Sequence, residues 1–324
     1  MTSRVFAPSA LPILAVLVPL FLAAPLAAQV ESCPVDSTSS ARICQAGADA
    51  LTLFLPLEGV LVGGGNPVPG TAGALGKFGK FRLAARVGFA TATLPSTSYD
   101  GVSDTVQADK RLLIPVPRLD LSIGLLSKKL ALGTASIDLL GSTVLLPTGV
   151  STRYRVDQNA RKIGSIALGL GFGVRAALVM PAPKPMVSLS VIKRDLPTLR
   201  FGDLAAGDQL SIATNLSAIN VRLMVGGKVK FLTLAAGAGM DLLKGAGSVS
   251  WHDSTSATDS TIAVKLSTSR IITTLNAAFE LGPISLWGEG GYQLGGKEKL
   301  TTIFERVDPA SGRFYGGAGI ALRF

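Results

Sequence analysis

From residue 81 to the end of the chain, apolar residues alternate with small or polar ones at a period of two. In the first segment the apolar positions are Phe81, Leu83, Ala85, Val87 and Phe89, and Arg82, Ala84, Arg86, Gly88 and Ala90 stand between them. Successive side chains of a β-strand point to opposite faces of a sheet, so this alternation predicts strands. The second face is rich in glycine, alanine and serine, which is unusual for the water-facing side of a soluble sheet.

The alternation recurs in ten segments, at residues 81–90, 118–125, 136–139, 166–178, 187–194, 210–225, 231–242, 267–281, 284–294 and 313–324. The connections between them alternate in length. The short ones are at 126–129, 180–185, 226–228 and 282–283, and the long polar ones are at 96–110, 148–162, 197–208, 244–261 and 295–312. In the segment 166–178, the apolar residues Leu168, Leu170 and Phe172 are predicted to face outward, and Arg175, on the other face, is predicted to point inward. Tight turns at one end and long loops at the other are typical of transmembrane barrels.

Composition points the same way. Charged residues are 16% of the chain, against roughly 25% in soluble domains, and the mean hydropathy is +0.44. After residue 28, no stretch approaches the ~20 consecutive apolar residues of a membrane helix, so the apolar surface belongs to strands. A sheet in lipid has no water to satisfy its edges and has to close on itself.

The last segment, "RFYGGAGIALRF", places Phe314, Ile320, Leu322 and Phe324 on one face and ends on a bare phenylalanine. This ending resembles the last strand of the bacterial outer-membrane β-barrel class. The resemblance implies an all-β, antiparallel transmembrane β-barrel of about 10 strands (12 being the alternative), in the outer membrane of a Gram-negative-type bacterium after export through the periplasm. It also implies that Ile320, Leu322 and Phe324 form an assembly signal read by the barrel assembly machinery. A secreted soluble β-sandwich or barrel is the competing interpretation.

The amino-terminal 80 residues divide in two. Residues 1–28 combine Arg4, an apolar core and small residues at Ala27 and Ala28, which predicts a cleaved signal peptide; a retained helical anchor is the alternative. Residues 29–80 are expected to hold a helix over 38–55, with Thr38, Ser39 or Ser40 as N-cap and Pro56 as its stop, followed by a Gly/Pro-rich connector. This segment is either periplasmic or a plug in the lumen. Residues 81–324 are the barrel domain.

Cysteine occurs twice, at Cys33 and Cys44. In an exported protein this pair is a candidate disulfide, and two free thiols are the alternative.

Charged residues on the non-apolar face are expected to line the lumen. They are Arg82, Arg86, Arg118, Asp120, Asp138, Arg175, Arg222, Asp241, Arg270, Glu280, Glu289 and Arg323. One interpretation is an ion-pair network that fills a narrow barrel; the other is a constriction that favours anions, because rings of arginine attract them. Inward glycines leave room for water, a ligand or the amino-terminal segment.

Enzymatic chemistry has little support in the sequence, and we expect the protein not to be an enzyme. The single histidine, His252, stands in a predicted outer loop beside Asp253 and Ser254, and adjacency in sequence does not supply the geometry of a catalytic base. A rim hydrolase using His252 is the remote alternative. No metal-ligand cluster, phosphate loop or dinucleotide motif stands out, so we expect no metal and no cofactor.

The formal net charge is +10 with a pI near 9.8, which in an outer-membrane protein favours contact with lipid phosphates rather than nucleic acid. The sequence therefore predicts a porin-like barrel, a narrow pore or transporter for small solutes with an anion bias. A non-conducting structural or surface-interaction barrel is the second interpretation.

Overall fold

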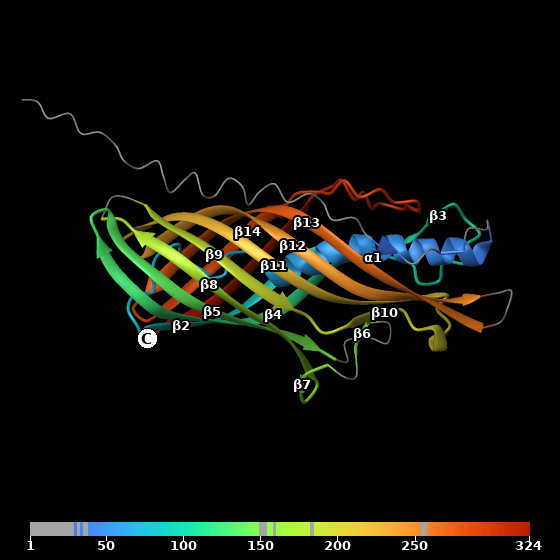
Figure 1. Cartoon of the computed structure of the whole chain (residues 1–324), viewed down its shortest axis with the longest axis horizontal. Coiled ribbons are helices and arrows are strands. Elements are labelled where there is room, and N and C mark those ends of the chain that lie inside the picture. Colours follow the sequence, from blue (N-terminus) through green and yellow to red (C-terminus); the bar gives the residue numbers. More distant parts are fainter. Residues whose placement is uncertain are drawn as a thin grey trace, which may run out of the picture.

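A computed structural model describes residues 29–30, 33–34, 38–148, 154–157, 160–181, 185–253 and 258–324. The predicted signal peptide lies outside the described residues. In the described part, ten strands form a closed antiparallel barrel (Figure 1): β2 (Phe81–Pro95), β4 (Ala108–Leu130), β5 (Gly133–Pro147), β8 (Ile166–Val179), β9 (Met186–Asp195), β11 (Leu210–Val229), β12 (Leu232–Asp253), β13 (Thr258–Leu281), β14 (Ile284–Gln293) and β16 (Arg313–Arg323). The predicted fold and its ten strands are confirmed.

The barrel closes where β16 pairs with β2, from Arg323 opposite Arg82 to Tyr315 opposite Ala90. Beyond that ladder, Phe324 and Phe81 exchange backbone hydrogen bonds of 3.0 and 3.3 Å. Their rings stack at 4.5 Å between centroids. The terminal phenylalanine therefore completes the seam between the first and last strands of the wall.

Short pieces of secondary structure lie in the connections: β1 (Gln29–Val30), β3 (Thr105–Val106), β6 (Tyr154–Val156), β7 (Lys162–Ile163), β10 (Leu199–Phe201), β15 (Ile303–Phe304) and the 3-10 helix η2 (Leu204–Ala206). Most of them lie at the end of the barrel opposite the C-terminus, which we call the loop end; the other is the turn end (Figure 1).

Two predicted turns and one predicted loop were misplaced. Residues 126–129 belong to β4 and residues 226–228 to β11, and the turns fall at 131–132 and 230–231 instead. Lys230 takes a left-handed φ of 55°, so the chain reverses there rather than at the glycines. The described residues of the predicted loop, 244–253 and 258–261, are strand: β12 and β13 stay paired out to Asp253 opposite Thr258, because their alternation continues past the wall.

Helix α1 (Ser39–Gly63) begins at the N-cap Thr38, whose hydroxyl accepts from the backbone N–H of Ala41. Its predicted end at Pro56 is wrong, because the helix continues to Gly63 with Pro56 inside it. A proline in a helix interior costs about 3 kcal/mol. Burial of Leu53, Leu55, Leu57 and Val60 around it offsets that cost.

The helix runs from the loop end into the barrel (Figure 1). It packs on inward side chains of the wall so closely that a Cβ at Gly59 would lie 3.3 Å from Leu243 Cγ, and one at Gly47 would overlap Val249 Cγ1. The hydrophobic core of the molecule is therefore inside the barrel, between α1 and the loop-end half of the wall.

Candidate functional site in the barrel lumen

The structure places most of the predicted lumen charges inside the turn-end half of the barrel, in buried ion pairs. One group joins three strands: Arg86 Nε lies 2.8 Å from Asp120 Oδ2, and Arg86 Nη1 lies 2.9 Å from Glu289 Oε1. Arg118 Nε lies 3.4 Å from Asp120 Oδ1. These side chains are at most 4% exposed.

Two further pairs form on neighbouring strands. Arg175 contacts Asp138 at 2.7 Å, and Arg222 contacts Asp241 at 2.6 Å. All four side chains are buried. Because opposite charges at this distance largely cancel, neither arginine presents a free positive charge to the lumen.

The remaining predicted residues lie toward the two ends. Arg82 is buried and donates to Pro69 O and Ser285 Oγ, both at 2.8 Å. At the turn-end rim, the half-exposed Arg323 lies 3.5 Å from Glu280, which also pairs with Lys228. At the loop end, Arg270 Nη2 lies 2.6 Å from Glu298 Oε1.

Several polar lumen residues were not predicted. Arg194 is fully buried and donates to Asn220 Oδ1, while Asn220 donates to Asp241 Oδ1 at 2.7 Å. Arg194 shares its strand face with Ser188 and Ser190. The alternation along this strand could have assigned Arg194 to the lumen. Ile192, an apolar residue on the same face, made that assignment ambiguous.

Helix α1 and the residues that follow are held by these arginines through backbone carbonyls. Arg222 Nη2 donates to Gly63 O at 2.8 Å, and Arg118 donates to Val62 O and, at 3.3 Å, to Gly64 O. The last carbonyls of a helix have no partner within it and carry its negative dipole end, so cations stabilise them.

Residues 64–80, the connector, then cross the turn-end half of the lumen. The backbone N–H of Asn66 donates to Glu289 Oε2 at 3.0 Å, and Asn66 O accepts from Arg86 Nη1 at 3.3 Å. The Asn66 side chain folds the connector on itself, accepting from Val68 N at 3.1 Å and donating to Thr71 O at 2.9 Å. The lumen is thus occupied by the chain's own amino-terminal segment.

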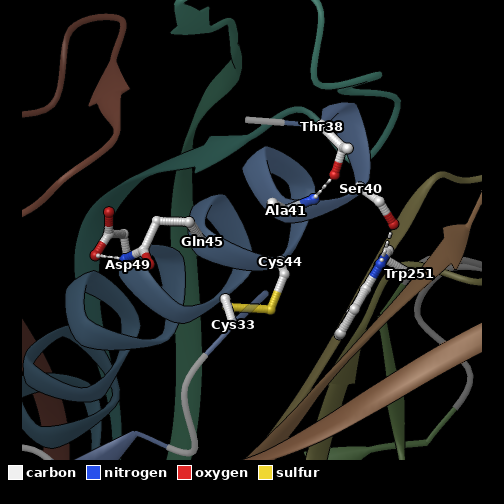
Figure 2. The surroundings of a disulfide bond; sticks show 8 residues. All are labelled: Cys33, Thr38, Ser40, Ala41, Cys44, Gln45, Asp49 and Trp251. Carbon is white, nitrogen blue, oxygen red and sulfur yellow. Dashed lines mark hydrogen bonds between the residues drawn. A yellow bond between two sulfur atoms is a disulfide. The ribbon is translucent and has the colours of Figure 1, made fainter. Parts of the chain in front are cut away.

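The start of α1 is fixed at the loop end by other contacts (Figure 2). Cys33 and Cys44 form a disulfide with their Cα atoms 5.9 Å apart, and Trp251 Nε1 of β12 donates to Ser40 Oγ at 2.8 Å. One carboxylate oxygen of Asp49 accepts from the backbone N–H groups of Thr301 and Thr302 at 2.9 and 2.7 Å.

Two unfilled spaces lie beside the same face of α1. A cavity of about 690 Å³ at the loop end is lined by Leu57 of α1, Ala92 of β2 and Arg313 of β16, among others. Deeper on the same side, a gap of about 10 Å³ is lined by Leu61, one helical turn on, and by Gly88 and Arg86. Gly88 pairs directly with Gly317 across the seam, so the missing side chains create this gap.

His252 lies near the tip of the β12–β13 hairpin, where its Nδ1 is 3.2 Å from Asp259 Oδ1. Both side chains are about half exposed. Ser254 lies outside the described residues. Among the described residues, no group of three or more His, Cys, Asp or Glu side chains is arranged to hold a metal ion.

The outer face carries the apolar residues as predicted from the alternation. Phe172 is 69% exposed and Phe314 75%, whereas Arg175 on the opposite face is 1% exposed. Ile320, Leu322 and Phe324 are also on this outer face. A bulge at Leu125 shifts β4, so that Leu126 rather than Leu125 is opposite Ile137.

No family model matches this sequence, and no curated protein matches it. Among solved structures, it is similar to the translocator domain of autotransporter NalP from Neisseria meningitidis, with a TM-score of 0.39 and 13% identity over 86% of this chain and 98% of that one. The transport unit of autotransporter AIDA-I from Escherichia coli gives 0.38 and 10% identity over 87% and 99%. It is also similar to the Pseudomonas putida toluene transporter TodX, with a TM-score of 0.33 and 11% identity over 75% of this chain and 88% of that one.

These neighbours are barrels of the outer membrane, and some are transporters by name. Similarity at this level carries no argument about what this chain does, and the geometry of its own lumen has to supply one.

Proposed function

We propose that the protein is an outer-membrane transport barrel for small solutes that is closed at rest by its own amino-terminal segment. The observation that carries the proposal is a pair of separate unfilled spaces beside the same face of α1: the 690 Å³ cavity at the loop end, and a gap of about 10 Å³ lined by Arg86 and Glu289, next to the connector. In an outer-membrane barrel the long loops face outward, so the larger space is on the cell-surface side.

Energetics indicate which part of the segment moves. The helix buries six large aliphatic side chains in the lumen: Leu51, Leu53, Leu55, Leu57, Val60 and Val62. At about 1.5–3 kcal/mol each, exposing them to water costs roughly 9–18 kcal/mol. Removal of the whole helix is therefore unfavourable, and α1 stays in place during transport.

The connector is held differently. Its contacts with the wall include hydrogen bonds from Arg82 to Pro69 O, from Arg86 to Asn66 O and from Asn66 N to Glu289. Each is worth about 0.5–3 kcal/mol, and water replaces them when the connector moves. We assign the connector as the gate and α1 as a fixed wall of the conduit.

Conductance in planar bilayers tests this assignment. The unmodified protein is expected to stay closed, and Asn66→Gly combined with Pro69→Gly is expected to give stepwise openings, because it removes the Asn66 side-chain bonds that fold the connector and the fixed φ of Pro69. Lys77→Gly with Lys80→Gly is the matched control at the exposed end of the connector and should stay closed. Equal conductance of the unmodified protein and the Asn66/Pro69 variant would overturn the proposal, and so would a folded variant that never opens.

Charge in the gate region supports an anion bias, carried by one arginine that the sequence predicted, Arg82, and one that it did not, Arg194. Six buried arginines (Arg82, Arg86, Arg118, Arg175, Arg194 and Arg222) stand against four carboxylates (Asp120, Asp138, Asp241 and Glu289). Among the described residues, Arg82 and Arg194 have no carboxylate within ion-pair distance. These two carry the surplus that would favour anions once the connector moves.

A permanently closed barrel is the second candidate, because the apolar packing of α1 and the Cys33–Cys44 disulfide both favour closure. Its function would lie in the long loops as an interaction surface. The conductance experiment separates the two, since a permanently closed barrel gives no openings in the Asn66/Pro69 variant.

A further inference from the structure

The cavity at the loop end is located at a gap in the barrel wall. The ladder between β16 and β2 ends at Tyr315 opposite Ala90, but β2 continues to Pro95 and over Thr91–Pro95 pairs only with β4. That free edge of β2 faces the cavity, which we call the seam cavity, through Thr91, Ala92, Thr93 and Pro95. The seam cavity is therefore bounded by α1 on the inside and reaches the outer face of the wall.

Its lining is apolar on the helix side and carries a single half-buried charge. Leu53, Phe54 and Leu57 come from α1, and Phe304 from the 295–312 connection. Arg313, the first residue of β16, also lines it and donates from Nη2 to Leu53 O at 3.2 Å. One hydrogen bond leaves most of the five N–H donors of a guanidinium for another partner.

The neighbouring charges do not neutralise Arg313. Glu298 is paired with Arg270 at 2.6 Å. Asp308, which lines the cavity, accepts from Ala310 N at 2.8 Å and from Ser311 Oγ at 3.1 Å within its own loop. Among the described residues, no carboxylate lies within ion-pair distance of Arg313, and an unneutralised guanidinium beside apolar walls is suited to an anion.

We propose that the seam cavity binds one amphipathic anion, a molecule with an apolar body and a single carboxylate, sulfate or phosphate head. The head group is held by Arg313 and the body lies against Leu53, Phe54, Leu57 and Phe304. The volume of about 690 Å³ is within the range of small-molecule sites. This inference rests on the proposed transport function, whose solute class it names, but binding is measured without transport, so either can fail alone.

Titration calorimetry with decanoate tests the site in the full chain, reconstituted in phosphatidylcholine nanodiscs and corrected with empty nanodiscs. We expect saturable one-to-one binding, similar binding of decyl sulfate, and much weaker binding of decanol and decyltrimethylammonium. Arg313→Gln should weaken decanoate binding about 10- to 100-fold, as expected for loss of a charged hydrogen-bond donor. Arg313→Lys should retain part of the affinity.

Arg306→Gln is the matched control, because Arg306 also lines the cavity but is mostly exposed and paired with Glu305 at 3.2 Å. It should bind as the unmodified protein does. If Arg313→Gln does not fold, Ala92→Phe, which fills the cavity and leaves Arg313 in place, serves instead and should also abolish binding. Equal binding by the unmodified protein and Arg313→Gln, or no saturable binding at all, would overturn the proposal.

Nanodiscs containing phosphatidylglycerol distinguish the two sources of such an anion. Weaker decanoate binding in them, dependent on Arg313, assigns the site to an anionic membrane lipid. Unchanged binding assigns it to a free solute, and either result supports the site.

Discussion

Replacement of the buried ion pairs measures how strongly the barrel holds its amino-terminal segment. Arg222 is fully buried, contacts Asp241 at 2.6 Å and donates to Gly63 O at 2.8 Å. Arg175 is equally buried and contacts Asp138 at 2.7 Å, but among the described residues its side chain donates hydrogen bonds to Asp138 alone. The two pairs therefore differ in whether they donate a hydrogen bond to residues 39–80.

The magnitudes follow from that difference. Arg222→Met and Arg175→Met each leave a buried carboxylate without its ion-pair partner. Each should lower the free energy of unfolding by about 3–5 kcal/mol. Adding Asp138→Leu to Arg175→Met removes the orphaned charge and should restore stability to near the unmodified value. Adding Asp241→Leu to Arg222→Met should leave a deficit of about 1–3 kcal/mol, because Gly63 O has lost its donor and the Asn220 amide its acceptor.

Urea unfolding of the barrel refolded in phospholipid vesicles gives these free energies, and hydrogen–deuterium exchange of the backbone at residues 63–70 gives the local effect. Exchange there should rise in the Arg222/Asp241 double variant and stay unchanged in the Arg175/Asp138 double variant. Equal stability of the two double variants, with equal exchange at 63–70, would refute the reasoning that Arg222 secures the end of the helix.

Three further predictions concern the two ends of the barrel and its lumen. Phe324→Ser should lower the yield of assembled, heat-modifiable barrel in cells, because it removes the stacked contact with Phe81 at the seam; normal yield would make Phe324 an ordinary strand end. An epitope tag placed directly after residue 28 should be detected on intact cells, because Gln29 pairs with Lys265 in the loop-end half of β13; detection only after permeabilisation would contradict this. In the opened Asn66/Pro69 variant, Arg82→Gln with Arg194→Gln should reduce the preference for anions in reversal potentials at low salt, and cation preference before that change would exclude an arginine-based bias.

Acid should weaken the attachment of the 295–312 connection. Burial alone would raise the pKa of Glu298, but hydrogen bonds from Arg270 and Thr268 and the charge of Arg270 outweigh it and hold the pKa below the usual glutamate value. A carboxyl with a lowered pKa in the folded state stabilises the protein above the unfolded value, near 4.3, and this stabilisation is lost as the pH falls through the folded pKa. The urea midpoint of the unmodified protein should therefore fall between pH 6 and pH 3, and that of Glu298→Gln should fall by a smaller amount. An identical fall in the two proteins would contradict a stabilising role for the Glu298 carboxylate.

The sequence predicted the wall better than the contents of the barrel, for a physical reason. Lipid outside demands apolar residues at every second position, so Phe172 and Arg175 could be assigned to opposite faces by parity. Inside the loop-end half, the inward residues are apolar too, as with Leu243 and Val249, because they pack on α1 rather than on water. The alternation of apolar and polar residues along a strand cannot indicate that a helix from elsewhere in the chain covers these inward residues.

The length of that helix was underestimated for the same reason. Pro56 is a local stop signal, but the lumen supplies apolar partners on all sides and keeps the helix intact past it. Gly47, which weakens a helix in isolation, is the residue that permits contact with Val249. Local propensity indicated where α1 starts, and tertiary packing decided where it ends.

A disulfide between the helix and the wall tests most directly whether the amino-terminal segment occupies the lumen. Since a Cβ at position 59 would lie 3.3 Å from Leu243 Cγ, Gly59→Cys with Leu243→Cys, in a chain where Cys33 and Cys44 are serine, brings two thiols within bonding range. Gly59→Cys with Leu275→Cys is the control, because Leu275 is 65% exposed on the outer face. We predict that mild oxidation of outer membranes links residues 59 and 243 in nearly every molecule and leaves the control unlinked, as read by mass spectrometry of the joined peptides. Assembled barrels in which 59 and 243 do not link would contradict a lumen filled by residues 39–80.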